Sequence, residues 1–415
     1  MGNYIKRDTF KIAKMDTANK TLAANIIAGA FTVHAITQIL ANFSILFFII
    51  NLKILVLYLL LMLFVISFFI DNSIISKNLK NVVFFALCMS LVYLFAYAYS
   101  GYKTSGGVLV VLISGSIFLA LRKDIQQKCI LWVINAFAIL FLLSLVEYIV
   151  DVLTGKRFVV AHVMRPSSNA SGFQFFEETL FNVIRTETGM PRFQSLTEEP
   201  GLIGTLCAFL LFVTGNDPKY RKQFFVFLTS VVLSFSLGGY VITFFYMVFL
   251  RIKSIKNMLF VVAMFICMAL FFGAFFNQLI FERLQSNDVD NRTNEQFDRL
   301  FRHAFETGEL WLGKGDIGYR ARVEGKNAGG KVWWYHYGIT SFFVVFFCYN
   351  YIYVSLCKRR RMSYGQFIFL LAFWISFYQR SDITEPHYLL PFVGAAILLS
   401  KNDVKSLKLE KREVK

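Results

Sequence analysis

Long runs of apolar residues constrain this chain more than any other feature. A helix that crosses the ~30 Å hydrocarbon core of a bilayer needs about 20 apolar residues, with a range of about 17–25. The chain is 56% hydrophobic and only 17% charged, whereas a soluble protein would carry about a quarter charged residues. The sequence therefore excludes a soluble enzyme and predicts an all-α polytopic membrane protein, with residues 1–415 forming a single integral membrane domain.

Twelve stretches are candidate transmembrane helices, although several are short. They are 28–50, 54–70, 81–100, 106–121, 129–150, 200–215, 224–237, 238–250, 257–276, 337–356, 367–379 and 387–400. The pair within 224–250 is also compatible with one bent unit, because Leu237-Gly238-Gly239 divides it.

The distribution of basic residues predicts the orientation. Of 43 Lys and Arg residues, 26 fall in the alternate connections that share a side with the N-terminus, and 3 fall in the short connections of the other side. Lys and Arg collect in cytoplasmic loops, so both termini are expected in the cytoplasm. The net charge of +17 is thereby explained by topology, and no nucleic-acid partner is expected.

Two long connections, 151–199 and 277–336, are predicted to lie outside the cytoplasm and to carry the chemistry. The second contains Phe297, Leu300, Phe301, Ala304 and Phe305, whose spacing places one apolar stripe on a helix. We expect this helix to lie at the outer membrane interface, with its stripe used for packing rather than for a ligand.

The first long connection ends in a segment suited to an anion. Pro200 fits the first turn of the following helix, with Thr197 or Glu198 as its cap, and Arg192 precedes it by a short stretch. The N-terminus of a helix attracts negative charge, and an arginine can approach the same point. An ordinary helix cap with an arginine at the interface is the equally weighted alternative.

Aromatic and basic residues lead into the late spans. The segment Trp333-Trp334-Tyr335-His336 suits an interfacial belt better than it suits stacking on sugars. Arg380 and His387 lie in the last short outer connection. Each histidine, taken alone, is more often structural than catalytic. The six cysteines lie in or beside apolar runs without CxxC spacing, which predicts core packing and neither a disulfide framework nor a metal site.

The string Arg192…Glu198-Glu199-Pro200-Gly201 resembles a feature of bacterial O-antigen and exopolysaccharide polymerases. The stretch Ser234-Phe235-Ser236-Leu237-Gly238-Gly239 and a late outer loop from Gly313 to Gly338 agree with it. The resemblance extends over the whole chain in its layout and implies a GT-C-like architecture of about twelve helices with two long extracytoplasmic loops.

The resemblance implies a glycosyltransferase of the bacterial inner membrane. It would move a growing glycan from undecaprenyl diphosphate to a lipid-linked repeat unit, without a metal or another cofactor. Its expected partners are the lipid-linked oligosaccharide, membrane lipids and a chain-length regulator protein. Arg192 would hold the diphosphate with help from Arg165 or Arg292, because guanidinium groups bind phosphate in a bidentate manner. Arg320 and Arg380 would give further contacts to phosphate or sugar, and Glu199, His336 and His387 compete for the role of base.

Two other functions remain as alternatives. An O-antigen ligase acting on lipid A core shares the layout, but such enzymes usually carry a His-Asn pair where this chain has Lys326-Asn327. A polysaccharide or lipid transporter (flippase) would show repeats and charges near the membrane midplane. The predicted spans contain almost no charge besides Glu147, near the end of one span.

Overall fold

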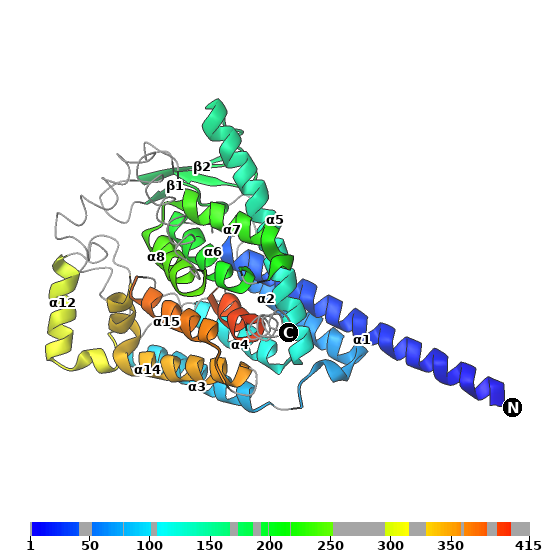
Figure 1. The fold of residues 1–415 in the computed structure, drawn as a ribbon. Helices are drawn as coiled ribbons and strands as arrows, with labels where there is room; N and C mark the ends of the chain where they lie inside the picture. Colours follow the sequence, from blue (N-terminus) through cyan, green and yellow to red (C-terminus); the bar gives the residue numbers. More distant parts are fainter. Residues whose placement is uncertain are drawn as a thin grey trace, which may run out of the picture.

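Helices form most of the structure, a computed structural model that describes residues 2–40, 52–77, 79–100, 106–166, 173–185, 192–197, 199–215, 217–251, 295–314, 329–357, 361–379 and 388–399 (Figure 1). The helices are α1 (Gly2–Ile39), α2 (Leu52–Ile70), α3 (Lys80–Ser100), α4 (Gly106–Ala120), α5 (Lys123–Thr154), α6 (Pro200–Thr214), α7 (Arg221–Ser234), α8 (Leu237–Tyr246), α12 (Glu295–Glu306), α14 (Gly330–Leu356), α15 (Tyr364–Gln379) and a last helix at Tyr388–Leu399. Short helical segments occur at η2 (Asn72–Ile74), η3 (Pro218–Tyr220), η4 (Met247–Arg251) and η6 (Glu309–Trp311).

The described helices are those of a membrane protein. Three of the described helical segments are long and apolar enough to cross a membrane: Thr17–Ile39, Lys123–Thr154 and Gly330–Leu356. Shorter apolar helices accompany them. Large apolar side chains also cover the outer faces of α2 and α5. Tyr58, Phe69, Ile139 and Val146 are among them, and Phe69 is 81% exposed. A soluble monomer rarely exposes apolar surface on this scale, because contact with water is unfavourable.

The predicted helix positions are confirmed at many of the described segments. The first predicted span differs, since α1 reaches Ile39 from Gly2 and residues 41–51 lie outside the described residues. The predicted span 257–276 also lies outside them. The 224–250 region forms two antiparallel helices, α7 and α8. Ser234 at the end of α7 and Ser236 at the start of α8 both lie beside Gly204, near the start of α6, so α7 runs toward this end of the bundle. α8 runs away from it, because Tyr246 at its end lies beside Gly215, just after the end of α6.

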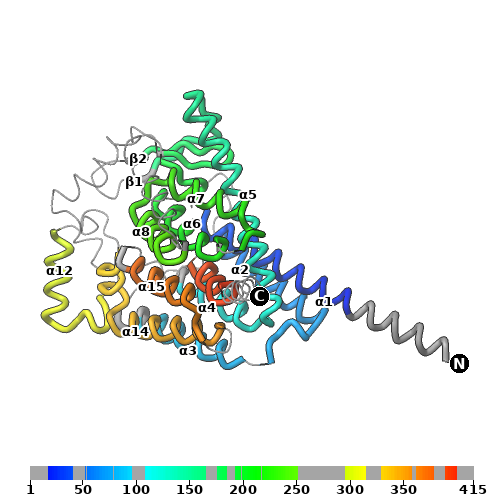
Figure 2. Tube along the Cα trace, viewed as in Figure 1, coloured from blue at the N-terminus to red at the C-terminus, as the bar shows by residue number. Residues whose placement is uncertain are grey.

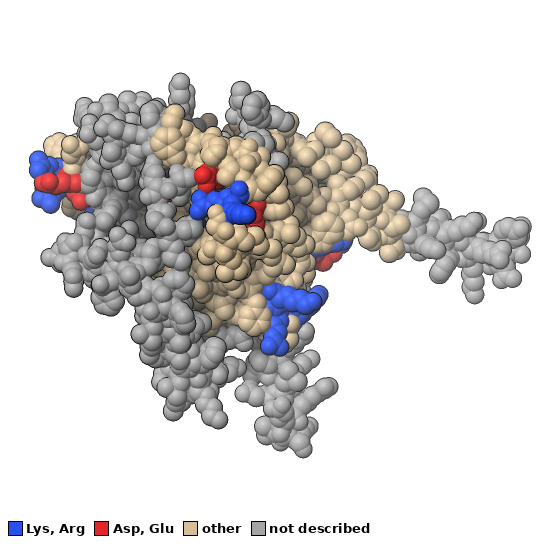
Figure 3. All heavy atoms as spheres, turned by 90° about the horizontal axis from the view of Figure 1, so that it is seen from above, with Lys and Arg blue, Asp and Glu red and all other residues tan. Residues whose placement is uncertain are grey.

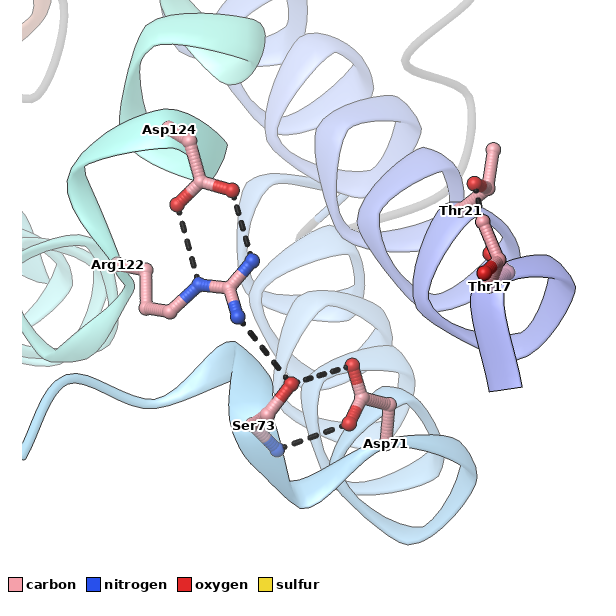
Figure 4. Close-up of polar contacts among 6 residues, drawn as sticks. All are labelled: Thr17, Thr21, Asp71, Ser73, Arg122 and Asp124. Atoms are coloured by element: carbon pink, nitrogen blue, oxygen red, sulfur yellow. Dashed lines mark hydrogen bonds and ion pairs between the residues drawn. The ribbon is translucent and has the colours of Figure 1, made fainter. Parts of the chain in front are cut away.

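Alternate connections meet at one end of the bundle, here named the basic end, whose described residues are 71–77, 79, 121–122, 215, 217–221, 251, 357 and 361–363. Figure 4 shows how Arg122 joins two of them. Its guanidinium donates to both carboxylate oxygens of Asp124, at 3.1 and 2.7 Å, and to the Ser73 hydroxyl at 3.2 Å. Ser73 in turn donates to the Asp71 carboxylate from its hydroxyl at 2.8 Å and its amide at 3.0 Å.

The other connections of the basic end are tied by contacts between distant helices. The Asn81 amide group at the start of α3 donates to the Ser355 hydroxyl at the end of α14 at 2.8 Å. The Tyr353 hydroxyl donates to the Gln366 carbonyl at 2.9 Å, and Leu250 lies 3.7 Å from where a Cβ on Gly365 would stand. The described parts of these alternate connections therefore lie together at one end of the bundle.

The connection 151–199 corrects the expectation of an all-α chain. It contains a three-stranded antiparallel sheet in the order β1 (Ala161–Pro166), β2 (Phe173–Glu178) and β3 (Val183–Arg185). Phe176 and Glu178 of β2 are buried, whereas Phe175 before them is 50% exposed and Glu177 between them is half-buried, which is the alternation of a strand with one covered face. Phe176 packs with Val183, Leu196 and Leu40 at the end of α1. Figure 2 shows the strands beside the far end of α5.

The core is centred on α6. From Ile203 to Thr214 every residue of this helix is buried, as expected for a helix that is apolar on all sides. Phe209 packs against Phe369, Phe373 and Tyr388, with ring centroids 5.5–6.1 Å apart. The core thus joins helices from the middle and the end of the chain.

Candidate functional site

The Arg192 junction (Arg192, Phe193, Ser234, Phe235 and Ser236) forms where α7 gives way to α8, at the end of the bundle opposite the basic end. Phe235 ends α7 in the left-handed conformation, with φ 48° and ψ 40°. The half-buried guanidinium of Arg192 donates from Nε to the Ser234 carbonyl at 3.1 Å and from Nη2 to the Phe235 carbonyl at 2.6 Å. The Phe193 amide donates to the Leu233 carbonyl at 3.0 Å. A cation at the C-terminus of a helix is favourable, typically by about 0.3–1 kcal/mol.

Two helix N-termini adjoin this junction. Ser236 caps α8 by accepting a hydrogen bond from the Gly239 amide at 3.2 Å. Gly239 lies so close to Gly204 of α6 that a Cβ added to Gly239 would stand 2.8 Å from the carbonyl carbon and oxygen of Gly204. α6 and α8 therefore begin side by side, and the first-turn amides of both helices give this region a positive potential.

The start of α6 agrees in part with the sequence. Pro200 occupies its first turn, as predicted, but Glu199 is the residue at the cap position and its side chain makes no capping bond. Thr197, one of the expected caps, donates instead to the carbonyls of Gln194 and Glu199 at 2.6 and 3.0 Å. The Glu199 side chain is exposed, so its carboxylate is directed to the surface beside the positive end of α6.

The loop that carries Arg192 is fixed from two sides. Ser195 adopts φ 51°, and its hydroxyl lies 2.7 Å from the Ser144 hydroxyl on α5. The Val183 amide of β3 donates to the Ser195 carbonyl at 2.8 Å. Phe193 is fully buried, with its ring centroid 5.5 Å from that of Tyr148. The backbone of Arg192 is therefore held by both α5 and the sheet.

Glu147 anchors the turn between β2 and β3 to α5. Its carboxylate accepts hydrogen bonds from the Thr179 hydroxyl at 2.7 Å, the Leu180 amide at 3.1 Å, the Phe181 amide at 2.9 Å and the Asn182 side-chain amide at 2.8 Å. The sequence predicted no role for this residue. Its position as a charge near the end of an apolar run was the available signal, because a carboxylate that is partly removed from water requires hydrogen-bond donors.

A second group of candidate residues surrounds a break in α14. Gly338 interrupts this helix with φ 85° and ψ 155°, and Gly313 crosses it with φ 83°. A Cβ on either glycine would stand 2.6 Å from the backbone of the opposite segment. The Lys314 amide donates to the Tyr335 carbonyl at 2.7 Å, which satisfies an acceptor exposed by the break. His336 is half-buried in this segment. The Lys314 ammonium holds the pKa of the Glu309 carboxyl below its ordinary value.

The predicted amphipathic helix exists as α12, at the edge of the molecule (Figure 1). Phe297 and Ala304 are buried against Leu310 and Tyr335, so most of the stripe packs within the protein as expected. Phe305, by contrast, is 65% exposed. Viewed from above, the described charged side chains gather in a few small groups, and the remaining described surface is uncharged (Figure 3).

The structure places only part of the predicted site. Arg192 and Glu199 belong to segments that meet at the junction, whereas His336 belongs to the group around the α14 break. Arg165 lies in β1 opposite Gln174, and its side chain is outside the described residues. The remaining candidates, Arg292, Arg320, Arg380 and His387, lie outside them entirely. Among the residues that are described, no group of three or more His, Cys, Asp and Glu side chains is arranged to hold a metal ion.

Comparison of the chain with protein-family models, with characterised proteins and with solved structures finds no match.

Proposed function

We propose that this chain is an O-antigen or related surface-polysaccharide polymerase of a bacterial inner membrane. In this proposal about twelve helices cross the bilayer, the basic end faces the cytoplasm and the Arg192 junction faces the periplasm. The enzyme transfers a growing glycan from undecaprenyl diphosphate to a hydroxyl of a lipid-linked repeat unit.

The position of Arg192 is the observation that carries the proposal. Its guanidinium lies beside the N-termini of α6 and α8, at the end of the bundle opposite the clustered basic connections. The bonds from Nε and Nη2 of this guanidinium to two backbone carbonyls fix its orientation, which favours recognition of a diphosphate over a loosely held point charge.

In the proposed reaction the bond between the anomeric carbon and the diphosphate oxygen breaks as the acceptor hydroxyl attacks. Negative charge then grows on the departing lipid diphosphate. Arg192 and the two helix N-termini stabilise this charge, which is often the largest single contribution to catalysis. A base that takes the proton of the acceptor hydroxyl increases the reaction rate by about 10²–10⁴-fold. Glu199 is the candidate base at the junction, and His336 and His387 are the competing ones.

Reconstitution tests the proposal directly. The purified chain in proteoliposomes is given undecaprenyl-diphosphate-linked repeat unit, and products are separated on a gel. We expect a ladder of polymer from the unmodified chain, none from Arg192→Ala and little from Arg192→Lys, because an ammonium lacks the planar pair of donors. Full-length polymer from Arg192→Ala would refute the phosphate role.

Arg157→Ala is the matched control. Arg157 also lies at the junction end, but its guanidinium is paired with the Glu177 carboxylate at 2.7 Å, so its loss should leave the ladder intact. Because Arg192 also caps α7, each variant is first checked for a monodisperse peak on size-exclusion chromatography in detergent. Only a variant with the elution profile of the unmodified chain is assayed.

A deletion strain separates the polymerase from the ligase alternative. Loss of a polymerase leaves single repeat units on the cell surface, whereas loss of a ligase removes the surface glycan altogether. Reporter fusions within 173–185 test the orientation, and periplasmic activity of the reporter is the expected result. A cytoplasmic location of this segment would refute the proposed mechanism.

A further inference from the structure

Helices α3 and α14 pack antiparallel, and their contacts fix a register. At the basic end, the Asn81 side-chain amide donates to the Ser355 hydroxyl at 2.8 Å. One turn further into the bundle, Phe84 and Tyr351 lie with ring centroids 4.5 Å apart. The two helices therefore pair residue by residue in opposite directions along the chain.

This register brings two thiols together. Cys88 lies two helical turns beyond Asn81, and Cys348 lies two turns before Ser355. The two side chains are in hydrogen-bonding contact, and both are free thiols. Cys348 is fully buried, whereas Cys88 is partly exposed on the apolar surface of the bundle. A reagent dissolved in the lipid can therefore reach one thiol of the pair, while the second thiol lies directly behind it.

We propose that Cys88 and Cys348 form a modification site within the membrane, at which a lipid-soluble two-electron oxidant of the diazene type joins α3 to α14 through a reversible disulfide. A disulfide requires Cα atoms about 4.4–6.8 Å apart, which neighbouring positions on closely packed helices can satisfy. The consequence for the fold is specific. The bond fixes α14, the helix that carries the break at Gly338 and the candidate base His336, to α3.

The chemistry balances with a diazene as the oxidant. The Cys88 sulfur adds to one nitrogen of the N=N bond, and its proton passes to the other nitrogen. The Cys348 sulfur then attacks the Cys88 sulfur, the S–N bond breaks, and the Cys348 proton passes to the departing nitrogen. The two thiols lose two electrons and two protons in total, and the diazene becomes a hydrazine.

The test uses the full-length chain in its native membranes with the diazene diamide. Treated and untreated samples are denatured, remaining thiols are blocked with N-ethylmaleimide, and peptides are mapped by mass spectrometry without reduction. We expect a linked peptide pair containing Cys88 and Cys348, and its disappearance after dithiothreitol. Cys357, which is buried at the end of α14, serves as an internal thiol that should stay unlinked.

Cys88→Ser and Cys348→Ser are the matched variants. Each should remove the linked pair and leave the other thiol open to N-ethylmaleimide in denaturant. Failure to detect the linked pair in the unmodified chain overturns the proposal, as does preferential linkage of either cysteine to any other cysteine. The mapping of the unmodified chain decides the question even if a variant does not fold, and it is independent of glycan transfer.

Discussion

Removal of the Glu147 carboxylate should release the turn between β2 and β3 from α5. Four donors converge on this carboxylate, but two of them have a second acceptor: Thr179 also donates to the Asn182 carbonyl at 3.1 Å, and Asn182 to the Ser144 carbonyl at 2.9 Å. The Leu180 and Phe181 amides therefore account for most of the loss. A hydrogen bond to a charged group contributes about 1.5–3 kcal/mol, and Leu180 is 57% exposed, so its amide regains a bond to water.

We estimate that Glu147→Ala destabilises the closed turn by about 2–3 kcal/mol. The difference corresponds to about 30- to 150-fold faster amide exchange, since each 1.4 kcal/mol is about tenfold. Hydrogen–deuterium exchange followed by mass spectrometry measures this in peptides covering 179–182. Peptides from α6, in the buried core, should exchange unchanged and provide the internal reference.

Glu177→Ala is the control for loss of a negative charge from the same sheet. Its carboxylate pairs with Arg157 at a partly exposed site, where an ion pair contributes about 0–1 kcal/mol. We expect the amides at 179–182 to exchange within about fivefold of the unmodified rate in this variant. Equal exchange at Leu180 and Phe181 in the unmodified chain and in Glu147→Ala would refute the anchoring role.

Three further substitutions test other parts of the fold. Gly338→Ala should lower the thermal stability of the detergent-solubilised chain far more than Gly155→Ala. Both glycines have positive φ, but only the Cβ added at Gly338 would stand 2.6 Å from opposing backbone, so equal losses would contradict this reasoning. Arg122→Ala should cost less than about 1 kcal/mol in chemical unfolding, because its ion pair is substantially exposed, and a larger cost would show that the basic end depends on it. Gly239→Ala should separate the starts of α6 and α8 and lower polymer yield in the reconstituted assay, whereas an undiminished ladder would show that their close approach is not needed.

The helical part of the fold was predictable because apolar run length is a strong signal. The runs at 54–70, 81–100 and 106–121 coincide with α2, α3 and α4 to within a residue or two. The helix ends were less predictable. α5 extends to Lys123 and Thr154 beyond the predicted 129–150, since polar residues at both ends continue the helix without lengthening the apolar run from which it was predicted.

The sheet was not predictable from the same signal. Its strands are three to six residues long, and the pattern of one covered face persists over only a few positions. The crossing of Gly313 and Gly338 was equally hidden. Both glycines were noted as the limits of a late loop, but close backbone contact depends on tertiary packing that no local pattern encodes.

The candidate site was predictable at one end only. Arg192 and Pro200 were recognisable because an arginine before a proline-initiated helix has a local physical meaning, and both lie at the junction. The bonds from Arg192 to the carbonyls at the end of α7 could not be foreseen, because they join segments that are remote in sequence. The contribution of Glu147 depends in the same way on a turn that follows it by more than thirty residues.

The enclosure of α6 has a consequence for biosynthesis. Its neighbours include α15 and the Tyr388–Leu399 helix, which follow it in the chain and are therefore synthesised later. Until those segments are in place, Phe209 and Phe212 lack the aromatic partners that pack on them in the folded chain. Packing around α6 is therefore completed only after residues 364–399 have been made, and we expect a chain truncated before residue 364 to leave this helix without its aromatic partners.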